Sequence, residues 1–231
     1  PGIQTNSEID SGIHIQGCDN AHNEISIEGI PLYGVNHLLG FFSVFNPSHY
    51  GKMSLSNISS SNRLGGAILM ELPDTLKQKF SADVTVGMMS SQGTLGVRIG
   101  NKSHLKLSAR TSYLDLLYKR WMKLKHSQFD YGFSDYNLTY VLVPSDQDKL
   151  WADFYYGRDA SGLDEISYNI DLTVGWQNLL SALHYEHKGS VWQKHSLFYS
   201  GYSSQNNVLQ EESNLSLYSY IMSVGYKGRY K

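Results

Sequence analysis

The chain has 231 residues, which is enough for one large domain or two small ones. Its 19 Lys and Arg residues against 21 Asp and Glu residues give a net charge of -2, which lacks the basic excess of a nucleic-acid-binding domain. A single cysteine, Cys18, excludes an internal disulfide framework and a cysteine-based zinc site. No apolar run approaches the ~18 residues of a membrane-spanning helix, but transmembrane β-barrels hide their membrane signal in alternation and stay possible.

Residues 1–74 contain short apolar runs among many Gly, Asn, Ser and Ile residues, whereas residues 79–231 alternate polar and apolar residues. In one such segment, Tyr136 and Leu138 share one face and Asp135 and Asn137 share the other. The alternation predicts about nine antiparallel strands in an all-β protein. They cover residues 82–88, 94–99, 103–113, 135–142, 150–157, 168–176, 179–187, 191–202 and 216–226.

The connections between these segments alternate in length. Short turns are expected at 101–102, 144–148 and 176–178, and longer loops at 114–130 and 158–167. This is typical of a membrane barrel with short periplasmic turns and long outer loops, although the loop at 203–213 fits only if the preceding strand is longer. Tyr113, Trp176 and Tyr226 lie near strand ends on the apolar faces, which predicts aromatic girdles. A soluble β-sandwich would show the same alternation.

Four short motifs follow one another in the first 74 residues. They read Pro1-Gly2-Ile3, Ile15-Gln16-Gly17, Ile27-Glu28-Gly29-Ile30-Pro31 and Gly65-Gly66-Ala67-Ile68-Leu69. Their order resembles the plug domain of TonB-dependent outer-membrane receptors, and the stretch 40–46 looks most like receptors of Bacteroidetes-type bacteria. Gln16 stands where the family has arginine, which removes a guanidinium that could pair with barrel carboxylates, and Glu28 stands where it has aspartate.

The resemblance implies a partial plug domain over residues 1–74 and the N-terminal portion of a transmembrane β-barrel over residues 79–231. The plug-motif residues are then Gly17, Glu28, Gly29, Pro31, Gly65 and Gly66. Gly29 suits a turn with positive φ, and the Gly65-Gly66 pair is expected to let the plug backbone approach the barrel wall. Because plug apex loops of the family face the external ligand, the expected ligand-binding residues are Asp19, Asn20, His22 and Asn23.

No motif for covalent chemistry or for a cofactor is found, so no catalytic residue, metal site or cofactor is expected. On a strand, His184 and Glu186 would share a face while His187 points away, which argues against a metal site. His195-Ser196 and His104 offer residue types of a barrel hydrolase without a specific spacing. The basic segment 119–126 is expected on an outer loop, either as a solvated tip or in contact with lipopolysaccharide phosphates or an anionic ligand.

The resemblance implies a receptor in the outer membrane of a Gram-negative bacterium that imports a scarce nutrient: an iron chelate, cobalamin or a glycan. Its partners would be outer-membrane lipid, the extracellular nutrient and the inner-membrane TonB complex, which acts through a segment missing here; nucleic acid is not expected. About nine strands are too few for the about 22 of plugged transporters, so the chain is expected to be a fragment that is not competent alone. The alternatives are a small porin-like barrel, a soluble β-sandwich binding protein and a barrel hydrolase.

Overall fold

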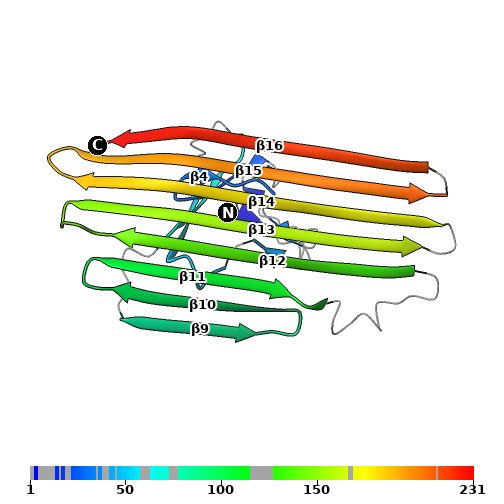
Figure 1. The fold of residues 1–231 in the computed structure, drawn as a ribbon. Helices are drawn as coiled ribbons and strands as arrows, with labels where there is room; N and C mark the ends of the chain where they lie inside the picture. The colour runs from blue at the N-terminus through cyan, green and yellow to red at the C-terminus, as the bar shows by residue number, and fades with distance from the viewer. Residues whose placement is uncertain are drawn as a thin grey trace.

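A computed structural model describes residues 3–4, 14–15, 17–18, 22–34, 36–37, 42–44, 46–57, 63–72, 78–114, 127–165, 169–211 and 213–231. Its elements are all β-strands, which confirms the all-β prediction (Figure 1). In this part of the chain, no helix is long and apolar enough to cross a membrane.

The N-terminal unit, β1 to β8, forms small sheets. A four-stranded sheet has the order β4-β3-β8-β7, with β3 and β8 parallel, and two further strand pairs are β1–β2 and β5–β6. The bounds are β1 Ile3–Gln4, β2 His14–Ile15, β3 Glu24–Ile27, β4 Ile30–Pro31, β5 Asn36–His37, β6 Phe42–Ser43, β7 Lys52–Ser56 and β8 Ala67–Glu71.

The large sheet, β9 to β16, is an eight-stranded antiparallel meander in which each strand pairs with its neighbours in sequence. The bounds are β9 Phe80–Val86, β10 Ser90–Ile99, β11 Ser103–Ser112, β12 Ser127–Leu142, β13 Asp148–Glu165, β14 Ile170–Lys188, β15 Trp192–Gln210 and β16 Ser213–Tyr230. At one end, called here the short-turn end, the strands join through residues 100–102, 143–147 and 189–191. β11 ends at Ser112 and β12 begins at Ser127 at the opposite end, called here the long-loop end.

The N-terminal unit packs against one face of the large sheet, called here the inner face (Figure 1). Ile25, Ile27, Ile30, Ile68 and Met70 of the unit form one buried apolar cluster with residues of β13 and β14. The sheet contributes Tyr155, Leu180 and Ala182 to that cluster. Burial of these side chains holds the unit on the sheet, since apolar surface removed from water is the main favourable term in packing.

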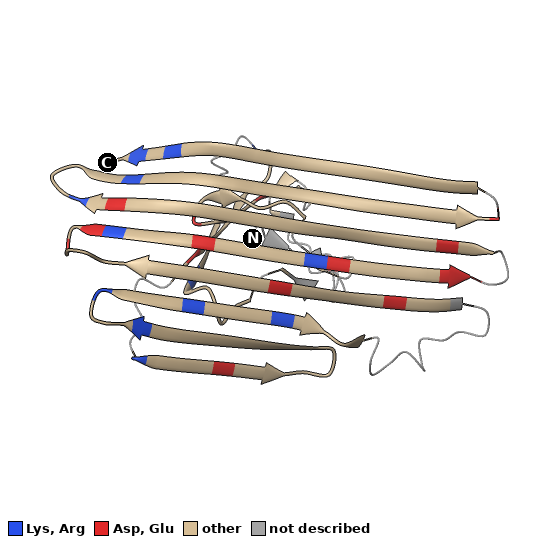
Figure 2. Cartoon of the chain, in the orientation of Figure 1, with Lys and Arg blue, Asp and Glu red and all other residues tan. Residues whose placement is uncertain are grey.

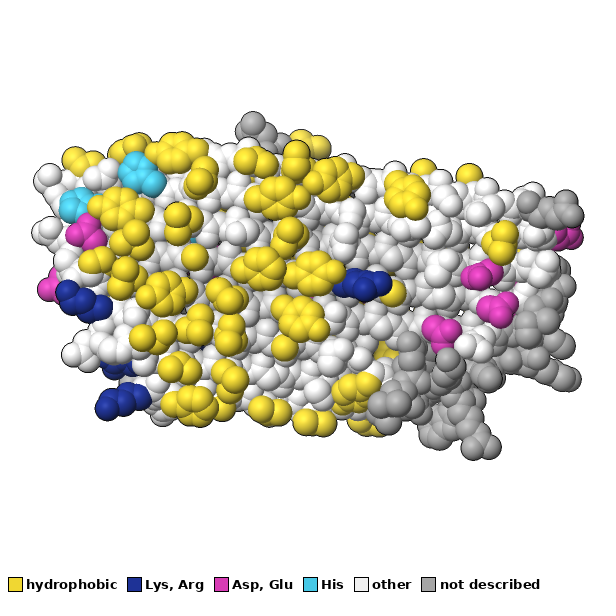
Figure 3. Space-filling view, in the orientation of Figure 1, with side chains coloured by type: hydrophobic (Ala, Val, Ile, Leu, Met, Phe, Trp, Pro, Cys, Tyr) yellow, Lys and Arg dark blue, Asp and Glu magenta, His cyan; other side chains and the backbone are white. Residues whose placement is uncertain are grey.

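The alternation predicted the two faces of the sheet correctly. Asp135 and Asn137 are buried against the N-terminal unit, whereas Tyr136 and Leu138 are 49% and 38% exposed on the outer face. Figure 3 shows apolar side chains spread over the outer face toward the short-turn end, with far fewer toward the long-loop end.

The expected number of strands was wrong by one. The segments 168–176 and 179–187 are a single strand, β14, and the turn expected at 176–178 lies inside it. Register is continuous through this point, where Trp176 pairs with Asp159 and Asn178 pairs with Gly157. The loop expected at 158–167 is mostly strand as well, since β13 continues to Glu165. The strand before the expected loop at 203–213 is longer than the sequence pattern suggested, since β15 reaches Gln210.

The aromatic-girdle prediction was wrong for Trp176. Gln177 is outside, bonded to Tyr156 Oη at 3.2 Å, and Asn178 is inside, bonded to the carbonyl of Gly34 at 2.7 Å, so Trp176 faces inward. An 18-residue strand such as β13 is about 60 Å long, whereas the apolar band of a barrel is only ~25 Å tall. Each long strand therefore extends beyond the apolar belt toward the long-loop end. There the polar side chains of the strand face outward. Figure 2 shows the matching change in charge, with acidic residues prevailing toward the long-loop end.

Candidate functional site

The hairpin between β3 and β4 places the predicted motif residues Glu28, Gly29 and Pro31 against the large sheet. Glu28 has φ 53° and Gly29 has φ 83°, the left-handed pair of a two-residue turn, so the predicted turn is confirmed. Lys194 Nζ of β15 lies 2.6 Å from Glu28 Oε2, and the Leu72 amide donates to Glu28 Oε1 at 2.9 Å. The carboxylate thus joins the hairpin to both β15 and the end of β8.

Backbone carbonyls of the same region accept hydrogen bonds from the sheet. The donors are Ser200 Oγ to Pro31 at 2.6 Å, Asn178 Nδ2 to Gly34 at 2.7 Å and Lys227 Nζ to Gly29 at 3.2 Å. Side chains of β14, β15 and β16 therefore hold the segment 29–34.

The closest contacts of the Gly65-Gly66 pair lie within the N-terminal unit, whereas the expected approach to the barrel wall stays a prediction. A Cβ on Gly65 would lie 2.2 Å from Asn23 Oδ1, and one on Gly66 would lie 2.3 Å from the carbonyl oxygen of Ser56. The glycines let segments within the N-terminal unit pack closely. Gly17 has φ 74°, which also favours glycine.

The four residues expected to bind ligand are not brought together as a set by the structure. Asp19 and Asn20 lie outside the described residues. His22 is exposed, whereas Asn23 is buried and its Oδ1 accepts a hydrogen bond from the Gly66 amide at 3.2 Å. Asn23 therefore has a structural role in this conformation, and ligand binding by the set stays a prediction.

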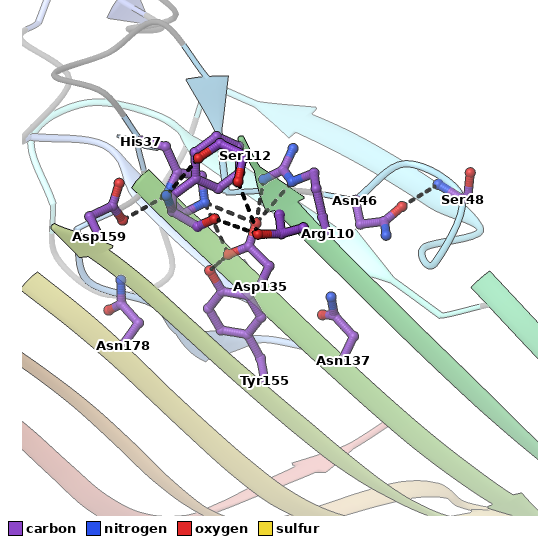
Figure 4. Close-up of polar contacts among 12 residues, drawn as sticks. His37, Asn46, Ser48, Arg110, Ser112, Asp135, Asn137, Tyr155, Asp159 and Asn178 are labelled. Carbon is purple, nitrogen blue, oxygen red and sulfur yellow. Dashed lines mark hydrogen bonds and ion pairs between the residues drawn. The ribbon is translucent and has the colours of Figure 1, made fainter. Parts of the chain in front are cut away.

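His37 of β5 lies between two carboxylates of the large sheet (Figure 4). Its Nδ1 is 2.6 Å from Asp159 Oδ2, and its Nε2 is 3.0 Å from Asp135 Oδ1. Arg110 donates through Nε and Nη2 to Asp135 Oδ2 at 2.9 and 2.6 Å, and the His37 ring stacks on Phe133 with centroids 4.3 Å apart. Burial by itself lowers the pKa of His37, but the hydrogen bonds to Asp135 and Asp159 and the Coulomb attraction of these carboxylates together outweigh that effect, so the pKa is raised above 6.5.

His49 meets hydroxyl groups instead of carboxylates. Its Nδ1 and Nε2 lie 2.7 Å from Ser108 Oγ and 2.9 Å from Thr139 Oγ1. Burial, and secondarily the charge of Lys106, lower its pKa to about 3. The ring is therefore neutral at physiological pH.

A polar chain continues from this point across the inner face. Thr139 Oγ1 donates to Asp153 at 3.1 Å, Asp153 lies 3.3 Å from His184 Nε2, and His184 Nδ1 lies 2.7 Å from Ser196 Oγ. Acid, imidazole and hydroxyl stand in the order of a nucleophilic triad. Asp153, His184 and Ser196 are each at most 5% exposed, so a substrate has no access to Ser196. This series of polar contacts is therefore a structural network in this conformation.

A cavity of about 900 Å³ opens in the long-loop half of the large sheet. Tyr131, Phe133, Trp176 and Asp159 line it, together with serines such as Ser204. Tyr131, Phe133 and Asp159 also belong to the surroundings of His37, because Tyr131 Oη donates to Asp159 and Phe133 stacks on the imidazole. One wall of the cavity is therefore continuous with the contact to the N-terminal unit.

Solved structures of receptors have a similar fold. The ferric enterobactin receptor of Pseudomonas aeruginosa (a mutant) superposes with a TM-score of 0.64 at 8% identity, over 99% of this chain and 42% of the receptor chain. The ferric preacinetobactin receptor of Acinetobacter baumannii superposes with a TM-score of 0.50 at 12% identity, over 97% and 46%. The chain has the fold of a TonB-dependent receptor. It spans less than half the length of these two receptors. No family model matches the sequence, and no curated protein sequence matches it.

In this fold the large antiparallel sheet corresponds to part of a receptor β-barrel. The sequence placed Asp135 on the polar face of its strand but did not identify its contact with His37 of the N-terminal unit. Asp159 fell in a segment expected to be a loop, and His37 belongs to no motif. Among the residues that the structure describes, no group of three or more His, Cys, Asp or Glu side chains is arranged to hold a metal ion.

Proposed function

We propose that this chain is part of a TonB-dependent receptor that imports a scarce nutrient across the outer membrane of a Gram-negative bacterium. In this proposal residues 1–74 are the C-terminal part of the plug, and residues 79–231 are the first strands of the barrel. The observation that carries the proposal is the plug unit held by side-chain hydrogen bonds on the polar inner face of a sheet whose outer face is apolar.

The outer face supports contact with lipid. Leu183, Leu197 and Phe154 are 56%, 60% and 40% exposed there, and they belong to a broad apolar surface (Figure 3). Contiguous apolar patches of this kind are rare on soluble monomers and mark an interaction surface. Because the patch covers the short-turn half of a β-sheet with a polar inner face, outer-membrane lipid is the partner that fits it best.

The cavity is the proposed site for the extracellular ligand. Its volume of about 900 Å³ is at the upper end of small-molecule sites, and it is lined by aromatic rings and hydroxyl groups. An iron chelate, cobalamin and a glycan all remain candidates. The segment with Asp19, Asn20 and His22 is a second proposed contact, whereas Asn23 would first have to release the Gly66 amide.

The proposed transport step involves no covalent chemistry. The TonB complex of the inner membrane would pull the plug, and the contacts of the segment 28–37 with the wall would open as the plug moves. The whole receptor, rather than this chain by itself, would carry out import.

The test begins with localisation of the whole natural protein by cell fractionation, which is expected to recover it in the outer membrane. Variants that keep Trp176 as the single tryptophan are then titrated with a ferric catecholate chelate, cyanocobalamin and a neutral oligosaccharide. Saturable change in the emission of Trp176 with one probe is expected, whereas matched variants that keep only Trp192, at the short-turn end, should not respond. Recovery in the soluble fraction, or equal responses of both variants, would contradict the proposal.

A further inference from the structure

We propose that His37 is a protonation-dependent latch between plug and barrel wall. Its cationic ring clamps Asp135 and Asp159, and loss of the ring proton opens the clamp. The latch concerns the contact next to the ligand cavity, and it assigns a role to a histidine that no motif identified.

Hydrogen-bond chemistry is the first argument. Both ring nitrogens of His37 face carboxylate oxygens, at 2.6 Å to Asp159 and 3.0 Å to Asp135. A neutral imidazole has one N–H donor, while an imidazolium has two. Ionised carboxylates only accept, so the geometry is satisfied at both nitrogens by the protonated ring. A neutral ring would turn a lone pair toward one buried carboxylate.

Charge balance is the second argument. Among the described residues, the charged groups around His37 are Asp135 on β12, Asp159 on β13 and Arg110 on β11. Tyr155 Oη donates to Asp135 at 3.0 Å, and Tyr131 Oη donates to Asp159, so both phenols stabilise the carboxylates. With His37 protonated the cluster holds two positive and two negative charges, whereas deprotonation leaves one uncompensated negative charge in a buried site.

His49 provides an internal comparison. It is buried to the same degree, at 1% exposure, and also bridges two strands of the wall. Its partners are hydroxyl groups, which can donate or accept, so a neutral ring satisfies both contacts. The carboxylates therefore distinguish the latch from an ordinary buried histidine.

The position of the latch links it to the cavity. Asp159, Tyr131 and Phe133 line the cavity and also contact His37 or its partners. A ligand group that donates a hydrogen bond to Asp159 would compete with His37 for the same carboxylate. This coupling rests on the proposed ligand site, whereas the pH dependence of the latch does not.

The direction of the pH effect follows from the raised pKa of His37. The contribution of the latch is fully present below the unfolded pKa of ~6.5 and is lost as the pH rises through the higher pKa of the packed state. Alkaline conditions should therefore loosen the plug near His37, and acid conditions should not.

The experiment measures hydrogen exchange of plug peptides covering residues 33–46 in the whole protein in detergent micelles, without ligand. Rates are taken between about pH 6 and pH 10 and corrected for intrinsic base catalysis. In the wild-type protein the corrected exchange rate should rise in a step of about tenfold or more as the pH rises, because the charge-assisted hydrogen bonds of His37 are lost. H37Q should exchange fast at every pH, and H49Q, the matched control, should keep the step.

A second readout is the NMR titration of the two histidine rings. His37 should titrate above the ordinary histidine value, and His49 should stay neutral over the same range. A His37 ring that is neutral at about pH 6, or a step that persists in H37Q, would overturn the latch. The exchange experiment contains no ligand, so its outcome is independent of the binding titrations. A pH step together with no binding of any probe supports the latch and contradicts the proposed function. Binding of a probe without a pH step supports the proposed function and contradicts the latch.

Discussion

Replacement of Lys194 by Met is expected to loosen the plug hairpin at Glu28. The two side chains are 14% and 10% exposed, and the Nζ–Oε2 distance is 2.6 Å. At an effective dielectric constant of about 20, the Coulomb attraction at this distance is about 6 kcal/mol. Desolvation of both ions offsets most of it, so we expect a loss of about 2 kcal/mol when the carboxylate is left without its cation. This corresponds to about 30-fold faster exchange of the Leu72 amide, which donates to Glu28 Oε1.

Hydrogen exchange of the whole protein measures this loss, and a double-mutant cycle isolates the pair. E28Q combined with K194M removes both charges and keeps an acceptor for the Leu72 amide, so the double variant should recover about half of the protection lost in K194M. Equal exchange in K194M and wild type would refute the reasoning. So would strictly additive effects of the two substitutions, because they would mean that the ions do not interact.

Two further substitutions test the packing of the plug and the extent of the apolar belt. G66A should lower the stability of the plug by about 1–3 kcal/mol, because the new Cβ would lie 2.3 Å from the Ser56 carbonyl oxygen. Chemical denaturation, with unfolding monitored by hydrogen exchange, measures this loss. Wild-type stability of the variant would contradict the close approach. F154R places a cation on the apolar outer face and should reduce folding into lipid vesicles by about 2–4 kcal/mol. T173R is the control: Thr173 is exposed on the same face as Gln177, nearer the long-loop end and opposite Gly162, so this variant should fold like wild type. Equal folding yields of the two variants would mean that the apolar belt does not cover Phe154.

Alternation was sufficient to predict the sheet because each face meets one environment over the short-turn half. Tyr136 and Leu138 lie outside and Asp135 and Asn137 inside, as the pattern required. The pattern failed where the environment changes along one strand. In β14 the apolar residues before position 177 face inward and Leu183 faces outward, so the parity of the pattern changes without a turn.

The plug contacts could be predicted only where a turn motif marked them. Glu28 and Gly29 require left-handed backbone, so the hairpin was visible from local chemistry. The His37 cluster joins residues separated by 98 and 122 positions. No local pattern records such a contact, because register and sheet curvature decide which polar residues meet.

Beside the apolar cluster with β13 and β14, a large part of the plug–wall contact is polar, and that part is suited to an interface that must open. A hydrogen bond between plug and wall is replaced by bonds to water when the two separate, so its net contribution is only about 0.5–1.5 kcal/mol. An apolar contact would resist separation in proportion to its whole area. The contacts of Ser200, Asn178 and Lys227 to plug carbonyls therefore fix the position of the plug without making its release prohibitive. The charged contacts of Glu28 and His37 are the stronger ones, and they are the points at which a pull, a ligand or a proton would act most effectively on the plug.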